Sequence, residues 1–255
     1  MAEKPPHLPA AYELLHLTVA DSARDEAIRQ ARSGAGEGML VWVDAQHAGR
    51  ARLDRPWLSP PQGLYCALVL RPEFSLVRAA ELPLLACVAL GTAMAEQVQA
   101  MTDLRFRWPN DVILNQAKLA GVWLDAGPLV DGLPQWLVLS CAVNVGEPPP
   151  LPFAEAACVA VEGGVPALRP ADLLAGYARQ LLGWLERWDR QGLAPVLRQF
   201  IGRAQRRAEP LQLVLASGEE ISGSLLDYDP HGGLVIQTAG ALRRVSLAEF
   251  LGLSA

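Results

Sequence analysis

Four segments with the pattern of β-strands follow one another in the middle of the chain, with no helical pattern between them. They cover residues 104–108, 112–114, 118–125 and 136–145. The first alternates apolar and polar side chains and stops at Pro109, which cannot donate a hydrogen bond within a sheet. Asn115-Gln116-Ala117 fits a hairpin turn between the second and third segments. The sequence therefore predicts consecutive strands in this region.

Further strand and helix patterns stand on either side of this region. Strand patterns cover residues 12–20, 39–43 and 64–70, and helical patterns cover residues 23–31, 82–99, 173–188 and 193–207. Asp21 and Ser22 have side chains that cap the N-terminus of a helix. Trp184 and Trp188 are four residues apart, which fits an aromatic cofactor box but fits the buried face of a helix better.

The composition changes at Pro210. Strand patterns follow at residues 211–215, 221–227, 233–238 and 242–245, with glycines or an Asp-Pro pair at the turns between them. This spacing predicts a small β-barrel of about 45 residues. Residues 146–152 contain four prolines and predict an extended connector before the last helices.

The composition is typical of a folded, soluble protein. Of the 255 residues, 51% are hydrophobic, which is enough for a sizeable core. The net charge of -5 gives no overall attraction to nucleic acid or to anionic membranes. The N-terminus has no apolar signal-peptide core, and the longest apolar stretch, residues 82–94, is too short to span a bilayer. We therefore expect a cytoplasmic protein.

Several common kinds of site lack support in the sequence. The four cysteines form no Cys-x-x-Cys pair and the four histidines form no cluster, so we expect buried thiols rather than a metal site. The glycine-rich residues 34–38 precede a strand, whereas a dinucleotide-binding loop follows one. The chain contains no Gly-x-Ser-x-Gly elbow and no Walker loop, which removes the main support for a serine hydrolase or a P-loop nucleotide hydrolase.

Residues 45–63 form a long predicted loop that contains three arginines. Guanidinium groups bind phosphate oxygens in bidentate fashion, and a glycine such as Gly49 lets the backbone approach a ligand. Trp57 could stack on a base. The same composition also describes an ordinary solvated basic loop, so composition alone leaves both interpretations open.

A second unusual segment reads Arg107-Trp108-Pro109-Asn110-Asp111 and continues with Lys118-Leu119-Ala120-Gly121. Lys118 stands within an apolar strand pattern, and a partly buried lysine needs an anionic partner. The partner is either a ligand phosphate or carboxylate, or one of Asp111 and Asp125 in a structural ion pair. Periodicity alone favours the ion pair.

Together these segments resemble those of biotin–protein ligases. Residues 108–111 and 118–121 match the Trp-Pro-Asn-Asp and Lys-Leu-Ala-Gly motifs of that family in full. Residues 46–57 look like its glycine- and arginine-rich biotin-binding loop, and Val143-Asn144-Val145 looks like its Gly-Ile-Asn-Val strand. The resemblance covers about residues 12–255.

The resemblance implies an α/β (α+β) fold. A mixed sheet with flanking helices, of the biotin ligase and class II synthetase-like type, would form a catalytic domain at residues 1–208. A small SH3-like β-barrel would follow at residues 209–255. The DNA-binding winged helix of some members is not expected at the N-terminus, so neither a nucleic-acid partner nor a membrane partner is implied. A homodimer is compatible with the resemblance.

The implied activity is a two-step ligase reaction. Biotin and ATP, with Mg²⁺, give biotinyl-5′-AMP and pyrophosphate. The biotinyl group then passes to a lysine of a carrier protein, such as the biotin carboxyl carrier of acetyl-CoA carboxylase. Negative charge builds on the phosphoryl oxygens during the first step, so we expect preorganised cations to dominate the catalysis.

The same resemblance implies roles for particular residues. The implied catalytic residues are Lys118, which contacts the biotin carboxylate and the α-phosphate, Arg52, which holds the adenylate, and Asp111, which assists the incoming amine. The implied contacts to biotin or its adenylate are Ser22, Gln46, Gly49, Arg50, Arg52, Trp57, Asn110, Lys118, Gly121 and Asn144. The resemblance implies no metal ligand.

Several positions depart from the family pattern. In the loop, Ala51 replaces a glycine and Leu53-Asp54 replaces Arg-Gly, and near the start Ser22-Ala23-Arg24 replaces Ser-Thr-Asn. A left-handed backbone at a former glycine would cost on the order of 1 kcal/mol, and the lost hydroxyl and amide would leave the polar ring of biotin with fewer partners. Two alternatives follow: a lipoate or octanoate ligase or transferase on the same scaffold, and a non-catalytic protein that binds biotin or its adenylate.

Overall fold

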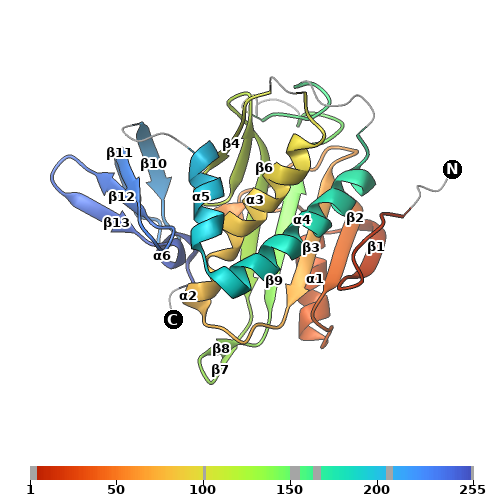
Figure 1. Ribbon diagram of the computed structural model, residues 1–255. Coiled ribbons are helices and arrows are strands. Elements are labelled where there is room, and N and C mark those ends of the chain that lie inside the picture. Colours follow the sequence, from red (N-terminus) through yellow and green to blue (C-terminus); the bar gives the residue numbers. More distant parts are fainter. Residues whose placement is uncertain (1–4, 100–101, 150–155, 163–167, 205–208, 254–255) are drawn as a thin grey trace.

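The computed structural model describes residues 5–99, 102–149, 156–162, 168–204 and 209–253. Its main sheet has seven strands in the order β1-β2-β3-β9-β6-β5-β4 (Figure 1). These strands are β1 (Glu13–Ala20), β2 (Met39–Gln46), β3 (Leu64–Leu70), β4 (Leu104–Arg107), β5 (Asp111–Leu114), β6 (Ala117–Ala126) and β9 (Leu137–Val143). β1 and β2 are parallel and the other neighbours are antiparallel, so the sheet is mixed, as the resemblance implied.

Helices cover both faces of this sheet (Figure 1). On one face, α1 (Ala23–Arg32) packs against β2, β3 and β9. On the other face lie α3 (Leu82–Ala95), α4 (Pro170–Gln191) and α5 (Ala194–Arg203), with the short helix α2 (Leu76–Ala79) leading into α3. The Ser22 hydroxyl accepts a hydrogen bond from the Asp25 amide, which confirms the predicted cap of α1.

The most apolar helix, α3, is enclosed by the fold. It packs against α4, α5 and strands β4 to β6, and nearly all of its side chains are buried. Residues 76–95 are long and apolar enough to cross a membrane by length and composition, yet 72% of the most apolar window is buried inside the protein. The stretch therefore forms the core helix of this fold. It ends at Ala95, before the predicted end at residue 99.

The core also contains the predicted tryptophan pair of α4. Trp188 is buried and Trp184 packs partly buried against the same core, which confirms that their spacing reflects a helix face. The four cysteines are free and buried, as expected from their spacing.

The predicted hairpin turn between β5 and β6 is present but shorter by one residue. Asn115 and Gln116 have φ of +47° and +71°, and Ala117 already begins β6. Two left-handed residues in sequence give the turn a twist that matches the strands it joins. A second, small hairpin of β7 (Leu129–Val130) and β8 (Leu133–Pro134) was not predicted, because its strands are only two residues long.

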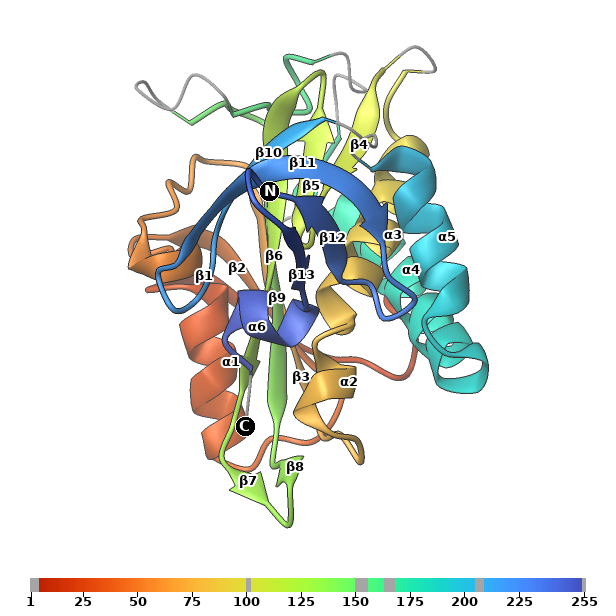
Figure 2. The same cartoon turned by 90° about the vertical axis from the view of Figure 1, so that its left-hand side faces the viewer.

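A second sheet follows α5. Its four antiparallel strands are β10 (Pro210–Val214), β11 (Glu220–Tyr228), β12 (Leu234–Gln237) and β13 (Leu242–Val245), which confirms the four predicted strands. Figure 2 shows this sheet curving in front of the main sheet, consistent with a small barrel-like unit. The short helix α6 (Leu247–Leu251) follows, with Ser246 and Glu249 in a capping box, and was missed because five residues are too few to show a helical period.

The two sheets share one hydrophobic core. Leu225, Ile236 and Val245 belong to the same cluster of buried residues as α3. The indole Nε1 of Trp108 donates a hydrogen bond to the Gly232 carbonyl at 2.7 Å. The predicted division of the chain at residue 208 stays a prediction, and residues 205–208 and 150–152 lie outside the described part of the chain.

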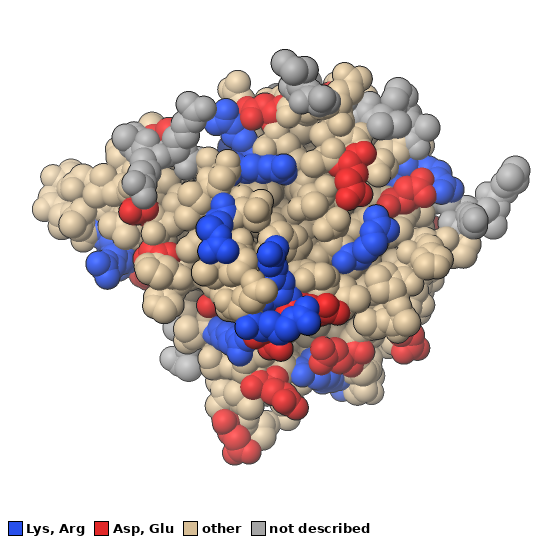
Figure 3. Space-filling view, viewed as in Figure 1, with Lys and Arg blue, Asp and Glu red and all other residues tan. Residues whose placement is uncertain are grey.

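The surface formed by the helices carries charges of both signs. Figure 3 shows Lys and Arg side chains interspersed with Asp and Glu on this face. Several of them pair, as in Arg78–Asp189 at 3.4 Å and Arg190–Glu186 at 3.4 Å. Such exposed pairs contribute little to stability, and this face has the character of an ordinary solvated surface.

We expect Gly91→Ala to destabilise the protein. A Cβ at this position of α3 would lie 2.5 Å from Cζ of Phe106, whose ring is buried and stacks on Phe200. Overpacking of this kind costs about 1–3 kcal/mol in the free energy of unfolding. Chemical denaturation measures the change. The control is Gly183→Ala in α4, where nothing lies within 4 Å and no loss is expected. Equal stability of the two variants would contradict the prediction.

Candidate active site

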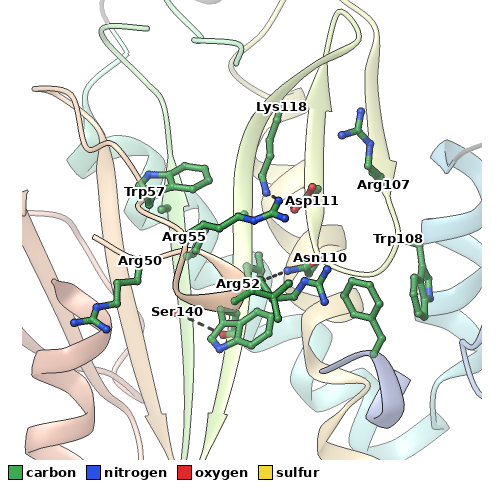
Figure 4. Close-up of a pocket in the computed structure, with 18 of the residues that line it drawn as sticks. Arg50, Arg52, Arg55, Trp57, Arg107, Trp108, Asn110, Asp111, Lys118 and Ser140 are labelled. Atoms are coloured by element: carbon green, nitrogen blue, oxygen red, sulfur yellow. Dashed lines mark hydrogen bonds and ion pairs between the residues drawn. The ribbon is translucent and has the colours of Figure 1, made fainter. Parts of the chain in front are cut away.

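A cavity of approximately 920 Å³ lies where the main sheet, the loop after β2 and the C-terminal sheet meet. Figure 4 shows the side chains that converge on it. The predicted site residues that line it are Ser22, Gln46, Arg50, Arg52, Trp57, Asn110, Asp111, Lys118 and Gly121. Gly49 and Asn144 are not among its lining residues. The fold therefore brings most of the predicted site together from segments far apart in the sequence.

A β-bulge in β6 directs Lys118 into the cavity. The pairing of β5 with β6 skips Leu119, which is an extra residue on β6. Because side chains alternate across a strand, the extra residue places Lys118 on the same face as Gly121 and Trp123. Leu119 and Ala120 are both buried in the core on the opposite face. Without the bulge, Lys118 would point into that core.

Lys118 forms an ion pair with Asp111, as the periodicity favoured. Its Nζ lies 2.7 Å from Oδ1 of Asp111, with the two side chains 32% and 15% exposed. Nζ also lies 5.4 Å from the centre of the Trp57 ring. The other predicted partner, Asp125, pairs with Arg24 instead. Because Lys118 remains accessible from the cavity, the pair does not prevent a ligand anion from approaching it.

Arginines add positive charge around this pair. Figure 4 shows Arg55 reaching toward Lys118 and Asp111, with Arg52 beside Asn110, whereas Arg50 points away from this group. Arg50 also lines the cavity, so its contact with the adenylate stays a prediction. Arg55 and Arg52 both line the cavity. Sequence reasoning had given Arg55 no role, although its place in the basic loop was the available signal.

Arg52 is held against α6, the short helix that follows the C-terminal sheet. Its guanidinium carbon lies 4.2 Å from the centre of the Phe250 ring, which is cation–π contact. Burial and the nearby Arg55 lower the pKa of Arg52 from its ordinary value, and Asp111 opposes this shift. Its Nη1 is buried and has no hydrogen-bond acceptor among the described residues. A buried guanidinium nitrogen without an acceptor is suited to an anionic ligand.

The loop after β2 folds back on itself. The Trp57 amide donates to the Gly49 carbonyl at 2.9 Å, and the Ala51 amide donates to the Arg55 carbonyl at 2.8 Å. A Cβ on Gly49 would lie 2.7 Å from the Trp57 carbonyl oxygen, so glycine is required there by close packing. Gly49 therefore shapes the loop and does not line the cavity.

The departures from the family loop have a different effect from the one expected. Ala51 has φ of -96° and ψ of -172°, an extended conformation that carries no penalty for a side chain. Leu53 has the left-handed conformation instead, with φ of +57°. The condition for strain is therefore not met at Ala51. A strained backbone lies two residues further on, where a non-glycine residue costs about 1–2 kcal/mol.

Two predicted biotin contacts use their polar groups within the protein. The Ser22 hydroxyl caps α1 and donates to Oδ2 of Asp25 at 2.8 Å. Oε1 of Gln46 accepts from the Ala23 amide at 3.2 Å, and its Nε2 donates to Oγ of Ser59 at 2.8 Å. Both side chains border the cavity, but their hydrogen bonds hold α1, β2 and the loop in place.

The two predicted asparagines also have structural hydrogen bonds. Asn110 lines the cavity, and its Nδ2 donates to the Val122 carbonyl at 2.7 Å, which holds the segment before β5 against β6. Asn144 is 1% exposed, and its Nδ2 donates to the Ala157 carbonyl at 3.0 Å. Asn144 does not line the cavity, and its predicted contact with the adenylate stays a prediction.

The C-terminal sheet completes the cavity wall. The residues it contributes are Pro210, Leu211, Gln212, Leu213, Val214, Leu225, Tyr228 and Leu234, and Phe250 comes from α6. Phe250 packs edge-on against Trp108, with ring centres 4.8 Å apart. No local sequence signal identified these residues, because their approach to the site depends on how the two sheets pack.

Comparisons with known proteins agree with this geometry. A biotin–[acetyl-CoA-carboxylase] ligase from Paracoccus denitrificans is 30% identical over 235 residues, which cover 90% of this chain and 96% of that protein. The structure of the biotin protein ligase from Aquifex aeolicus in complex with biotin and ATP aligns with a TM-score of 0.77 at 23% identity, over 93% of this chain and 97% of that one. A biotin protein ligase-like protein of unknown function from Silicibacter aligns with a TM-score of 0.79 at 20% identity, over 96% and 99% of the two chains.

The structural likenesses show the fold, and the sequence comparison shows the family. Residues 8–202 match the model of the biotin/lipoate A/B protein ligase family. That range contains β1 to β9, helices α1 to α4, α5 except its last residue, and the Lys118–Asp111 pair. The chain therefore belongs to the biotin/lipoate A/B protein ligase family.

Proposed function

We propose that this chain is an ATP-dependent ligase that activates biotin as biotinyl-5′-AMP and transfers it to a lysine of a carrier protein, such as the biotin carboxyl carrier of acetyl-CoA carboxylase. The observation that carries this proposal is the Lys118–Asp111 pair in a cavity bordered by arginines. The names of the relatives support the same activity, since one is a biotin–[acetyl-CoA-carboxylase] ligase and another was solved with biotin and ATP.

In the first step an oxygen of the biotin carboxylate attacks the α-phosphorus of ATP, and pyrophosphate leaves. Both reactants are anions, so the approach requires fixed positive charge. Lys118 supplies it from the cavity wall, and Arg52 adds a guanidinium nitrogen that is buried without an acceptor in the described chain. Cations that are already in position stabilise the charge on the phosphoryl oxygens without a cost of reorganisation.

In the second step the amine of the carrier lysine attacks the acyl carbon, and the bond to AMP breaks. The attacking nitrogen must lose a proton. Asp111 is the carboxylate at this place in the cavity, and it accepts that proton when Lys118 has moved to the phosphate. The ion pair therefore places a cation, Lys118, for the first step and a base, Asp111, for the second step at the same point of the cavity.

Mg²⁺ enters this proposal with ATP. The described residues contain no group of three or more His, Cys, Asp or Glu side chains that could hold a metal ion. Mg²⁺ commonly binds substrate phosphates and water with few protein carboxylates, so we infer that it arrives as the ATP complex.

The carrier domain approaches the same cavity. Homodimer formation and a cytoplasmic location remain part of the proposal, and the four buried free thiols suit a reducing compartment.

A second candidate is a lipoate or octanoate ligase on the same scaffold. Ala23 stands in the cavity wall where the family has a threonine, and the hydroxyl of Ser22 and the amide of Gln46 are already engaged. Pyrophosphate release in the presence of ATP and each acid, followed by transfer to a carrier domain, separates the candidates. Release with biotin alone supports the first, release with lipoate or octanoate alone supports the second, and no release would show a non-catalytic binding protein.

We expect Lys118→Ala to lose adenylation while keeping the fold. Removing one preorganised charge from the transition state lowers kcat roughly 100- to 1,000-fold. Pyrophosphate release measures the loss, and thermal melting checks the fold. The control is Arg105→Ala on β4, which removes an exposed cation that pairs with Asp103 outside the cavity. Near-normal turnover in Lys118→Ala would refute its role.

We expect Gly49→Ala to weaken binding of the acid and of ATP together. The added Cβ would displace the Trp57 backbone and with it the loop that lines the cavity. Misplacement of about 1 Å commonly costs one to two orders of magnitude, so we expect Kd to rise roughly tenfold or more in calorimetric titration. Gly36→Ala, which has open space around the new Cβ, should bind as the wild type does. Unchanged Kd in both variants would contradict this role for the loop.

A further inference from the structure

Arg24, at the start of α1, lines the cavity and forms an ion pair with Asp125 at the far end of β6, which is not among the lining residues. Nε of Arg24 donates to Oδ2 of Asp125 at 2.7 Å, and Nη2 donates to Oδ1 at 2.5 Å. The two side chains are only 23% and 16% exposed. The guanidinium carbon also lies 5.9 Å from the centre of the Trp123 ring, and both Arg24 and Trp123 line the cavity.

This pair and Lys118 mark opposite ends of the site. Lys118 and Asp125 are seven residues apart on β6, and the extra residue at the bulge leaves six regular steps, or roughly 20 Å at about 3.3 Å per residue. Gly121 and Trp123 lie between them on the same face and both line the cavity. An acid whose carboxylate meets Lys118 therefore extends along β6 toward Arg24 and Asp125.

The other polar side chains near that end are committed elsewhere. Ser22 caps α1, and Gln46 bridges the Ala23 amide and Ser59. Ser140 also lines the cavity, and its hydroxyl has only a long contact of 3.5 Å with the Trp123 carbonyl. The Arg24 guanidinium is therefore a charged donor that the far end of a bound acid can meet.

Stabilisation of the fold does not by itself explain why the Arg24–Asp125 ion pair is present. Arg24 is in the first turn of α1, where the helix dipole disfavours a cation. A half-buried ion pair also loses hydration, and apolar residues of similar volume are often as stable. The position of Arg24 in the cavity wall supplies another reason, because a guanidinium that a carboxylate holds in place offers preorganised donors to a ligand.

We propose that the Arg24–Asp125 pair determines which acid the site accepts. It selects an acid whose far end is a neutral polar group with a carbonyl acceptor, such as the cyclic urea of biotin, over acids that end in an alkyl chain or a dithiolane ring. The inference rests on the proposed function and deepens it. Arg24 thereby replaces the polar contacts that the family's threonine and asparagine would supply at Ala23 and Arg24.

The physical basis is the free-energy cost of covering the Arg24 guanidinium with a ligand that makes no hydrogen bond to it. An alkyl tail placed against it displaces water and offers no hydrogen bond in return, which is unfavourable for charged groups. A urea carbonyl accepts a hydrogen bond from the Arg24 guanidinium, which Asp125 holds in place, so the polar head replaces the lost water. Hydrogen bonds to charged groups contribute more than neutral ones, which makes the discrimination large.

The test compares the wild type with the double variant Arg24→Met and Asp125→Leu, which keeps volume and removes both charges. Calorimetric titration with biotin, lipoate and octanoate measures binding, and pyrophosphate release with ATP measures turnover for each acid. The control is Arg32→Met, an exposed arginine at the other end of α1. Thermal melting checks that the variants fold.

We expect the wild type to favour biotin, and the double variant to lose roughly 10- to 100-fold in biotin affinity and in kcat/KM, through KM, while octanoate is bound as well or better. Parallel losses for all three acids would show a merely structural pair and overturn the inference. A wild type that favours lipoate or octanoate, or binds none of the acids, would also overturn it. Arg24-dependent biotin binding without pyrophosphate release would support the inference and refute the proposed ligase activity.

Discussion

The burial of α3 is the constraint on which the rest of this structure depends. Its side chains are apolar on every side, so the helix must be enclosed rather than laid on a surface. The main sheet, α4, α5 and part of the C-terminal sheet meet this need by packing around it. Because that face of the sheet is filled, the ligand cavity lies on the opposite face, where Gly121 and Trp123 of β6 are accessible.

Strand β6 packs against the core with one face and lines the cavity with the other. One extra residue, Leu119, turns Lys118 out of the core and toward Asp111, while the strand continues with regular pairing to β9 as far as Asp125. The same strand thus carries Lys118, to which we assign the first step of the proposed reaction, and, at its far end, the partner of Arg24. A single strand fixes the distance between these two groups.

The C-terminal sheet has a direct part in this site. Its core is continuous with that of the main sheet, and Phe250 holds the Arg52 guanidinium against the cavity. The hydrogen bond from Trp108 to Gly232 ties the sheet to the Trp-Pro-Asn-Asp segment that precedes β5. A change in this packing would therefore alter both the cavity wall and the position of a cationic group, even though the sheet itself contributes mostly apolar residues.

The sequence by itself determined the elements whose patterns are local: the strands and helices, the turn at Asn115, the cap at Ser22, and the motif that singles out Asp111 and Lys118. Only the tertiary structure decided that Lys118 pairs with Asp111 while Asp125 pairs with Arg24, 101 residues away in the sequence. It also decided that Asn144 is buried away from the cavity and that Phe250 reaches it. The physical reason is that alternation and capping act between neighbours along the chain, whereas ion pairs and cavity walls depend on distances that exist only after distant segments have packed together.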